Sequence, residues 1–246
     1  MSGRVIAAIA HRVLHQLRRD PRTIVLILGM PPLLLTILRS VFDGRPELFA
    51  NVAVGLVGFF PLLLMFIITS ITMLRERTSG TLERLMSLPV AKADLLLGYA
   101  AAFGLVAAVQ ATVTATVTIG PLGVEIDGAA WLLVLFAVVN ALLGVALGLF
   151  ASAFARSEFQ AVQMMPALIL PQLLLCGLLA PRDQMGELLQ AISVALPMTW
   201  AFDGLARVAD GEGLGTSAVT RDLIVVLAVA LAALAAGAAT LRRRTP

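Results

Sequence analysis

The sequence has little charge and almost no polar stretches long enough for a soluble domain. Only 13% of its 246 residues are Asp, Glu, Lys or Arg, whereas 59% are hydrophobic. A typical soluble domain is about 25% charged and about 45–50% apolar. Apolar stretches of about 20 residues suit the roughly 30 Å hydrocarbon core of a membrane. The composition therefore predicts an integral membrane protein, with its basic residues as topology markers rather than a nucleic-acid-binding surface.

Cysteine and histidine are also scarce. The one cysteine, Cys176, can form no internal disulfide and cannot hold a metal alone, so we interpret it as a small buried residue. His11 and His15 are four residues apart and would share one helix face, but a catalytic zinc normally has three protein ligands. We therefore expect no metal site and no catalytic residue, and interpret residues 1–22 as a basic amphipathic helix on the membrane surface.

A recognisable phosphate-binding loop is missing as well. Such a loop follows the pattern G-x-x-x-x-G-K-S/T. The one lysine, Lys92, lies in SLPVAKADLL, and no glycine-rich segment precedes it. We therefore expect that this chain is not an enzyme and that any ATP hydrolysis takes place in a partner.

Six apolar segments are predicted to be membrane-spanning helices. Backbone amides in hydrocarbon must be paired within the segment, and helices do this. The fold class predicted is therefore an all-α, polytopic membrane protein in a single domain, residues 1–246. The alternating stretch ATVTATVT at 111–118 should also be helical, with its threonines bonded to carbonyls one turn earlier. The predicted spans are residues 24–42, 49–74, 95–119, 129–155, 162–180 and 222–241.

The arginines predict the orientation. If the N-terminus is cytoplasmic, thirteen of the 18 Lys and Arg residues lie in inside segments and five lie outside. The positive-inside rule favours this arrangement. We therefore predict a multi-pass protein of the cell (plasma) membrane with both termini cytoplasmic.

A row of small and polar residues recurs every four positions along the fourth span. Such a row lets two helices approach closely. The close contact could lie within the chain or between subunits, and the sequence leaves both open. The row consists of Asn140, Gly144, Gly148 and Ser152.

A polar interlude, MLRERTSGTLERLMSLPV at residues 73–90, separates the second and third spans. Its five charges would each cost about 2.5–3.5 kcal/mol at the centre of a span, so it must lie outside the hydrocarbon. Apolar residues at helical spacing predict a short amphipathic helix from about Ser79 to Ser87. Gly80 permits a turn before it, and Pro89 discourages helix beyond it. From the residues alone, this is either a helix resting on lipid or a docking element for a cytoplasmic partner.

Here the residues carry a resemblance. The run RERTSGTLERL at 75–85, followed by Leu88-Pro89 and Gly98, resembles the signature of ABC-2 type transporter permeases, the membrane subunits of ATP-driven exporters. Every position of the family core R-E-R-x-x-G-T-L-E matches. The position after Gly98, often basic in the family, is Tyr99. A second stretch from Cys176-Gly177 to Arg207 is also similar, so the resemblance covers nearly the whole chain.

The resemblance implies a permease that works as a homodimer or with a sister permease, beside two cytoplasmic ATP-binding-cassette subunits. ATP and Mg would be bound by those subunits, and this chain would bind no cofactor. Residues 75–90 would form a coupling helix seated in the ATPase. A second contact, or an ordinary turn, would contain Arg156 and Glu158. The candidate coupling residues are Arg75, Glu76, Arg77, Gly80, Thr81, Leu82, Glu83, Arg84, Leu85, Met86 and Pro89.

The outside segment 182–210 is predicted to hold two short interfacial helices that break at Pro197, with its acids and arginines on a solvated face. Span interiors rich in Leu, Val and Phe suit a hydrophobic or amphipathic cargo, such as a drug-like compound or a lipid. The alternative functions are an ion-coupled or passive carrier, or a scaffold, without an ATPase partner. Ion-coupled carriers usually place ionisable groups inside spans, and these spans have almost none. The pathway candidates, which could equally bond helix to helix, are Gln110, Thr114, Asn140, Gln163 and Gln172.

Overall fold

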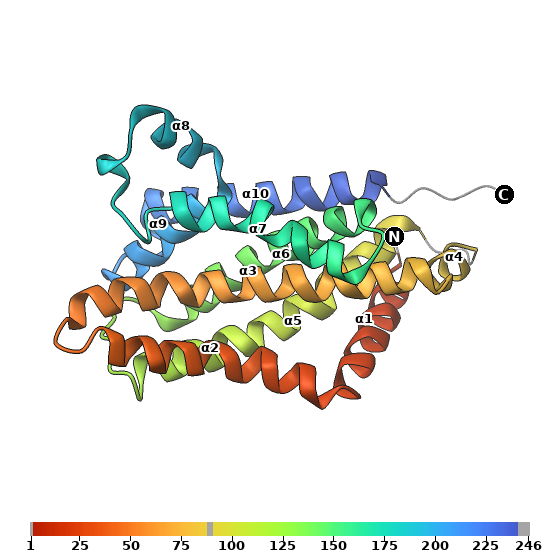
Figure 1. Cartoon of the computed structure of the whole chain (residues 1–246), viewed down its shortest axis with the longest axis horizontal. Coiled ribbons are helices and arrows are strands. Elements are labelled where there is room, and N and C mark those ends of the chain that lie inside the picture. Colours follow the sequence, from red (N-terminus) through yellow and green to blue (C-terminus); the bar gives the residue numbers. More distant parts are fainter. Residues whose placement is uncertain (1, 88–90, 241–246) are drawn as a thin grey trace.

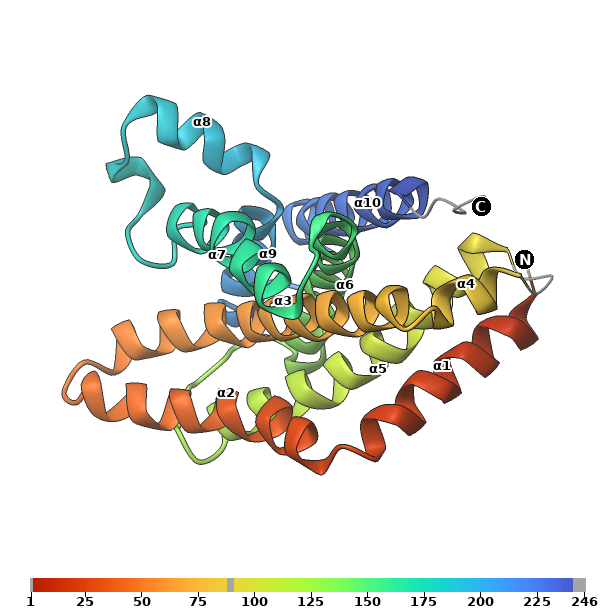
Figure 2. The same cartoon turned by 45° about the vertical axis from the view of Figure 1, so that its right-hand side comes forward.

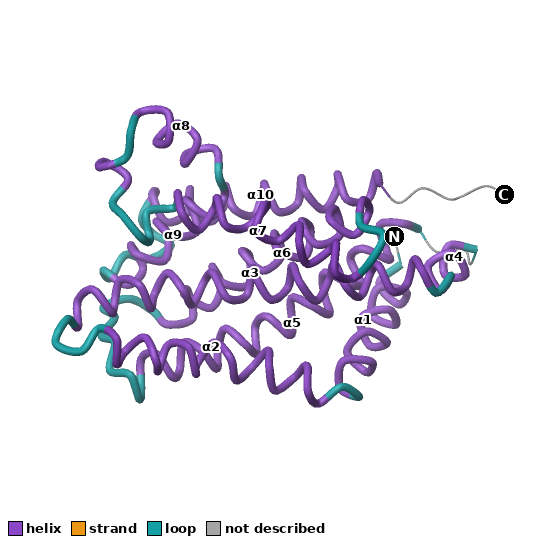
Figure 3. The backbone as a smooth tube through the Cα atoms, viewed as in Figure 1, coloured by secondary structure: helices purple, strands orange, loops and turns teal. Residues whose placement is uncertain are grey.

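The apolar segments form long helices, as the sequence predicts. The computed structural model describes residues 2–87 and 91–240, and these ranges contain helices joined by mostly short loops and no β-strand (Figure 3). The predicted all-α polytopic fold is confirmed. The helices are α1 Gly3–Arg18, α2 Pro21–Val41, α3 Pro46–Thr78, α4 Thr81–Met86, α5 Lys92–Ile119, α6 Ala130–Phe154, α7 Glu158–Leu175, the 3-10 turn η1 Arg182–Gln184, α8 Glu187–Ala195, α9 Pro197–Ala209 and α10 Ser217–Thr240.

In the described part of the chain, five helices are long and apolar enough to cross a membrane: α2, α3, α5, α6 and α10. The pair α8 and α9 bends by 85° just before Pro197, where the break was predicted, and could form a sixth, broken span. The predicted span 162–180 is instead the 18-residue helix α7, which starts at Glu158 and ends at Leu175. Its early residues include Glu158, Gln160 and Gln163, so within the described ranges it is too polar to count among the five.

The helices α3 and α6 pack against each other in the middle of the bundle (Figures 1 and 2). The predicted row of small residues on α6 makes this contact. A Cβ atom at Gly144 would overlap the Leu62 carbonyl, and one at Gly148 would lie 2.6 Å from the Phe66 carbonyl oxygen. The Asn140 side chain donates to the Gly58 carbonyl across the same contact, at 3.0 Å. Of the two possibilities that the sequence left open, packing within the chain is the one observed.

The threonines of α5 satisfy their hydroxyl groups within the helix. Thr112, Thr114, Thr116 and Thr118 each donate to the carbonyl four residues earlier, at 2.7–2.9 Å. A strand at this depth would leave backbone groups unpaired, whereas the helix pairs them all. The prediction of helix for the alternating stretch 111–118 is confirmed.

The helix α3 is longer than the span predicted at 49–74. Its 33 residues extend about 50 Å at 1.5 Å per residue, which exceeds the roughly 30 Å hydrocarbon core. Residues 75–78, predicted to belong to the coupling helix, are therefore the last turn of α3. A helix bonds its own backbone and does not have to stop where polar side chains begin. The chain then turns at Gly80, whose φ is +70°, and α4 begins at Thr81 instead of Ser79.

One end of the bundle collects the polar interlude and its neighbours. Helix α4, the start of α1, the start of α5, the α6–α7 loop and the end of α10 lie together there (Figure 1). We call this the α4 end. The α2–α3 and α5–α6 connections lie at the opposite end, and α8 stands off the bundle on that side (Figures 1 and 2).

Candidate functional site

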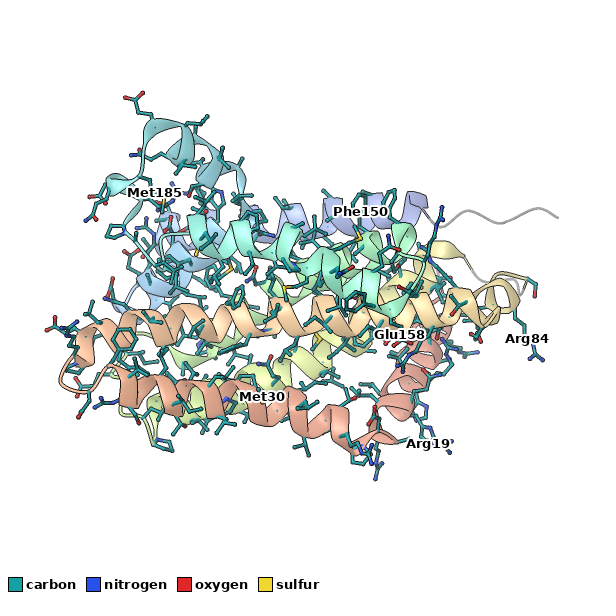
Figure 4. All side chains as sticks on the ribbon, in the orientation of Figure 1. Arg19, Met30, Arg84, Phe150, Glu158 and Met185 are labelled. Carbon is teal, nitrogen blue, oxygen red and sulfur yellow. The ribbon has the colours of Figure 1, made fainter. Side chains whose placement is uncertain are left out.

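The short helix α4 stands at the edge of the bundle, beyond the last turn of α3. Arg84 is exposed and projects away from the bundle (Figure 4), while Leu85 is half-buried and packs toward the core. The Ser79 and Thr81 hydroxyls lie 3.0 Å apart across the Gly80 turn. The side chains of Leu82, Glu83 and Met86 and the whole of Pro89 lie outside the described residues, so their assigned roles stay predictions.

The two segments predicted to contact an ATPase, residues 75–90 and the segment with Arg156 and Glu158, are joined by an ion pair. Arg75, near the end of α3, holds both carboxylate oxygens of Glu158: Nε lies 2.6 Å from Oε1 and Nη2 lies 3.0 Å from Oε2. This bidentate geometry is the strongest that arginine makes with a carboxylate. The hydrogen bond from Arg75 lowers the pKa of Glu158 below its usual value. Both side chains remain largely exposed, at 66% and 48%, so the pair lies on the surface of the α4 end.

The start of α7 is held in a defined shape around this ion pair. The Ser157 hydroxyl accepts from the Gln160 backbone N–H at 3.2 Å and caps the helix. The Gln160 side chain in turn accepts from the Arg156 backbone N–H at 2.8 Å. The exposed Arg156 and Glu158 are therefore carried on a structured turn beside the end of α3.

Glu76 points into the bundle, whereas Arg75 beside it is exposed. Only 6% of the residue is exposed, and Oε1 lies 2.6 Å from Nη2 of Arg12 on α1. The same Arg12 nitrogen donates to the Tyr99 hydroxyl of α5 at 2.8 Å. The assignment of Glu76 to a direct ATPase contact is corrected here, because its carboxylate is bonded inside the bundle. These three residues, Arg12, Glu76 and Tyr99, form what we call the internal network.

Sequence reasoning did not find this network. Its members are 64 and 87 residues apart in the chain, and nothing in the local pattern of α1 indicates a partner for Arg12. One signal was available: Tyr99 occupies a position that is often basic in the family that the sequence resembles. A buried tyrosine hydroxyl normally has a hydrogen-bond partner. Tyr99 is fully buried, and Arg12 supplies that bond.

Helix α1 is packed against α5 and does not simply rest on lipid. Its Ile9 and Val13 are buried in a cluster with apolar residues of α5. Gly98 makes the approach possible, because a Cβ there would lie 2.6 Å from Ile9. The Ser2 backbone N–H donates to the buried Asp94 carboxylate at 3.2 Å, which ties the start of α1 to the start of α5. A helix, Gly3–Arg18, forms within the predicted residues 1–22, and its apolar face is occupied by protein, while its contact with the membrane surface stays a prediction.

The predicted pathway residues do not gather in one place. Gln110 and Thr114 are buried and bonded to each other along α5 at 3.5 Å. Asn140 bonds to α3, and the Gln172 side chain donates to its own helix at 3.0 Å. Gln163 is exposed on α7. These bonds agree with a packing role for four of them, and a role in the transport pathway stays a prediction.

The opposite end holds charged pairs between α9, α10 and the loop after α7, and the predicted span 222–241 begins with a buried acid. Asp222 is fully buried, and its carboxylate bonds Arg207 of α9 at 3.2 Å and Arg221 of α10 at 2.9 Å. Arg182 pairs with Asp203 at 2.6 Å. Within the segment 182–210, Asp183, Glu187 and Asp210 are exposed as expected, whereas Asp203 and Arg207 are partly buried in pairs that join α9 to the loop after α7 and to α10. Charges that pair in this way can be buried, because each carboxylate keeps a cationic partner.

Comparison with known proteins places the sequence in a family of membrane transport proteins. The profile of the ABC-2 type transporter family matches residues 4–208. The chain is 27% identical over 168 residues to the inner membrane transport permease YhhJ of Escherichia coli (strain K12), which is 68% of this chain and 45% of YhhJ. It is 27% identical over 144 residues to the probable multidrug ABC transporter permease YbhR of the same organism, covering 58% of this chain and 39% of YbhR. It is 29% identical over 194 residues to ABC transporter G family member 20 of Dictyostelium discoideum, covering 78% of this chain and 27% of that protein. The matched regions thus span less than half the length of these relatives.

Proposed function

The chain belongs to the ABC-2 type transporter family, and on this premise we propose that it is the permease subunit of an ATP-driven exporter. It moves a hydrophobic or amphipathic substrate, a drug-like compound or a lipid, outward across the cell membrane. Separate ATP-binding-cassette subunits bind ATP and Mg and carry out hydrolysis. A second permease, identical or related, completes the transporter.

The observation that carries this proposal is the shape of the α4 end. Helix α3 extends beyond the length of a span, turns at Gly80 and presents α4 at the edge of the bundle. A short helix in this position can enter a cleft of a cytoplasmic partner without disturbing the packed spans. Arg84 points outward for such a contact. Glu83 is the proposed principal charged contact, and Leu82 and Met86 are the proposed apolar ones.

The ion pair between Arg75 and Glu158 extends the contact to a second segment. This ion pair joins the end of α3 to the start of α7, so a displacement of α4 is transmitted to both helices. Arg156 lies beside it on the capped turn and is exposed to the same side. We therefore place the second ATPase contact at residues 155–160.

The orientation follows from the distribution of charge. The α4 end carries most of the basic residues, so the positive-inside rule puts it in the cytoplasm. The start of α1 and the end of α10 lie at that end (Figure 1), which puts both termini of the chain on the cytoplasmic side in this proposal.

The spans supply surfaces for lipid and for a second permease. Only 17% of the apolar stretch of α2 and 28% of that of α10 is buried within the chain. Large apolar side chains on these helices, such as Val25, Leu33 and Leu231, are more than half exposed. In water such a surface would be unstable, whereas hydrocarbon or another permease covers it without cost.

An ion-coupled carrier is the principal alternative, since Glu76 and Asp222 are buried acids. Both are paired with arginine, at 2.6 Å and 2.9 Å. A carboxylate that relays protons has to release its partner in each cycle, and a close arginine opposes protonation. The paired state therefore favours a structural role and the exporter.

The test is co-purification in mild detergent with an ATP-binding subunit encoded beside this chain, followed by ATPase measurement. The variant Glu83→Arg reverses the principal proposed contact. Its matched control is Glu125→Arg, which makes the same change in the exposed loop at the opposite end.

We expect the wild type and Glu125→Arg to retain the ATPase subunit, and Glu83→Arg to lose it or to lose the stimulation of ATPase by cargo. If no ATPase subunit binds the wild type, or if Glu83→Arg behaves like Glu125→Arg, the docking role of α4 is wrong. The carrier and scaffold functions would then be reopened.

A further inference from the structure

A narrow apolar groove of about 210 Å³ lies on the outside of the bundle, where α1 and α2 meet α5. Part of its wall is open in the single chain, since Leu105 is 55% exposed and Val109 is 48% exposed. In a membrane, an apolar groove of this kind is filled by an apolar chain. The apolar residues that line it include Leu14, Ile24, Leu28, Leu105, Val106 and Val109.

One end of this groove is positively charged. Arg18 lines the groove, and Arg19 and Arg22 lie near Arg18 at the corner between α1 and α2. All three are exposed, and Figure 4 shows Arg19 on the outside of the bundle. Within residues 2–87 and 91–240, none of the three guanidinium groups forms an ion pair. Like charges at one corner repel one another, so an anion between them is favoured.

The corner contains an acid, Asp20, which does not cancel this charge. Its carboxylate accepts from the Thr23 backbone N–H at 3.2 Å and from the Thr23 hydroxyl at 2.6 Å. Its negative charge acts on Arg75 of α3 as well as on Arg22. Three arginines and one aspartate leave the stretch 18–22 with a net charge of +2. The corner therefore attracts an anion.

The charges and the apolar wall follow the order of groups in a phospholipid. The arginines lie around the start of α2, which begins at Pro21 and is long and apolar enough to cross a membrane. Ile24 and Leu28 follow on the groove wall, about one and two turns farther along this helix. Head groups lie at the membrane surface and acyl chains lie below it. A bound amphiphile would therefore have an anionic head group at the corner and its chain in the groove.

We propose that the groove between α1, α2 and α5 binds one anionic phospholipid, with its phosphate at the arginines of the corner. One acyl chain lies along Ile24, Val106 and Val109. Arginine holds phosphate oxygens through two parallel N–H bonds, and basic pockets between spans bind anionic head groups. A zwitterionic lipid is a poorer ligand, because its ammonium group would lie beside the same arginines. None of these residues belongs to the contacts assigned to the ATPase, so the inference goes beyond the proposed function and is tested without a partner.

The experiment is a lipid titration of the purified full-length chain in detergent, followed by native mass spectrometry, which counts bound lipids one by one. Dioleoyl phosphatidylglycerol is compared with dioleoyl phosphatidylcholine, which has the same chains and no net charge. Inorganic phosphate is the competitor that distinguishes a site for a free anion from a site for a lipid.

The charge of the corner is tested with Arg18→Gln/Arg19→Gln, which removes two positive charges and keeps polar side chains. Its matched control, Arg39→Gln/Arg45→Gln, makes the same change at the opposite end, where α2 leads into α3. We expect the wild type and the control to bind one phosphatidylglycerol equally well, and more tightly than phosphatidylcholine. One arginine near an anionic head group corresponds to about fivefold in affinity, so the double corner variant should bind about 25-fold more weakly.

The groove is tested with Val109→Trp, which fills it without changing charge. The matched control is Val41→Trp, which makes the same change at the far end of α2, where the residue is 71% exposed. We expect Val109→Trp to weaken phosphatidylglycerol binding about fivefold or more, because the displaced chain loses buried apolar contact. Val41→Trp should bind as the wild type does.

The inference is overturned if phosphatidylglycerol binds no more tightly than phosphatidylcholine, or if the double corner variant binds as its control does. It is also overturned if Val109→Trp binds like Val41→Trp, or if inorganic phosphate at the same concentration displaces the lipid, because charge alone would then hold the ligand. Variants are compared only where their size-exclusion profiles match that of the wild type. The corner and groove variants carry different substitutions, so either one that folds decides the test.

Discussion

Replacing Arg12 by methionine should destabilise the protein much more than replacing the arginine of the surface ion pair. Arg12 holds Glu76 at 2.6 Å and Tyr99 at 2.8 Å, and so joins α1, α3 and α5. Methionine has a similar length and keeps the apolar part of the contact. The substitution therefore removes the charge and its hydrogen bonds, and leaves the buried Glu76 carboxylate without its cationic partner.

The magnitude follows from burial. Breaking a fully buried ion pair by removing one partner costs about 3–5 kcal/mol. The Glu76 side chain is 8% exposed, but that of Arg12 is 28% exposed, so water reaches the pair and lowers the cost. We expect about 2–3 kcal/mol, which corresponds to a fall in melting temperature of roughly 5–10 °C for a chain of this size.

The control is Arg75→Met. This ion pair has the same shortest distance, 2.6 Å, but its side chains are 66% and 48% exposed. An exposed pair contributes only about 0–1 kcal/mol. The same distance with different burial should therefore give clearly different losses of stability. The double variant Arg12→Met/Glu76→Met leaves no unpaired charge and should recover most of the loss.

Thermal unfolding in one detergent, followed by fluorescence or circular dichroism at one protein concentration, compares these variants. Equal shifts for Arg12→Met and Arg75→Met would refute the reasoning, because burial would not decide the cost. A double variant as unstable as Arg12→Met would show that the loss comes from packing rather than from the stranded carboxylate.

Three further predictions concern other parts of the chain. Gly148→Val should push α6 away from the Phe66 carbonyl and destabilise the protein by several kcal/mol, visible as low yield or early melting, whereas a wild-type melting curve would contradict the close contact. Asn140→Leu should cost about 0.5–1.5 kcal/mol by removing the hydrogen bond between α6 and the Gly58 carbonyl of α3, and unchanged cargo selectivity in transport assays would assign the residue to packing alone. Because Arg75 lowers the pKa of Glu158, the stabilisation from this pair is fully present above the ordinary glutamate pKa of about 4.3 and is lost as the pH falls through the lowered value. The difference in melting temperature between the wild type and Glu158→Gln should therefore shrink below about pH 4, and a constant difference would be the contrary result.

Much of the fold could be predicted because it depends on local pattern. Hydrocarbon requires every backbone group to bond within its own segment, so long apolar stretches had to be helices, including the alternating threonines at 111–118. The row that includes Gly144 and Gly148 indicated close helix packing, and Pro197 marked the break between α8 and α9. The end of α3 was less predictable. Charged residues show where hydrocarbon ends, but they do not show where a helix ends.

The candidate site was predictable only in part. The signature at 75–85 identified the segment, and the turn at Gly80 was visible in the sequence. The orientation of each side chain could not be predicted from the sequence. Arg75 and Glu76 are neighbours, yet one pairs on the surface with Glu158 and the other inside with Arg12. A step of one residue rotates a helix by about 100°, so the tertiary position of α3 decides which residue faces solvent.

By itself, then, the sequence determined a membrane protein of long helices, its family and the segment offered to a partner, because hydrophobicity and short motifs act locally along the chain. Only the tertiary structure decided that α6 packs on α3, that Arg12 and Tyr99 hold Glu76, and that Asp222 is buried between two arginines. Only the tertiary structure placed Arg18 on one groove with Val106 and Val109. Apart from the pairs of Asp222, these contacts join residues tens of positions apart. They form only when helices meet in space, where burial and charge pairing select among partners that the sequence leaves equivalent.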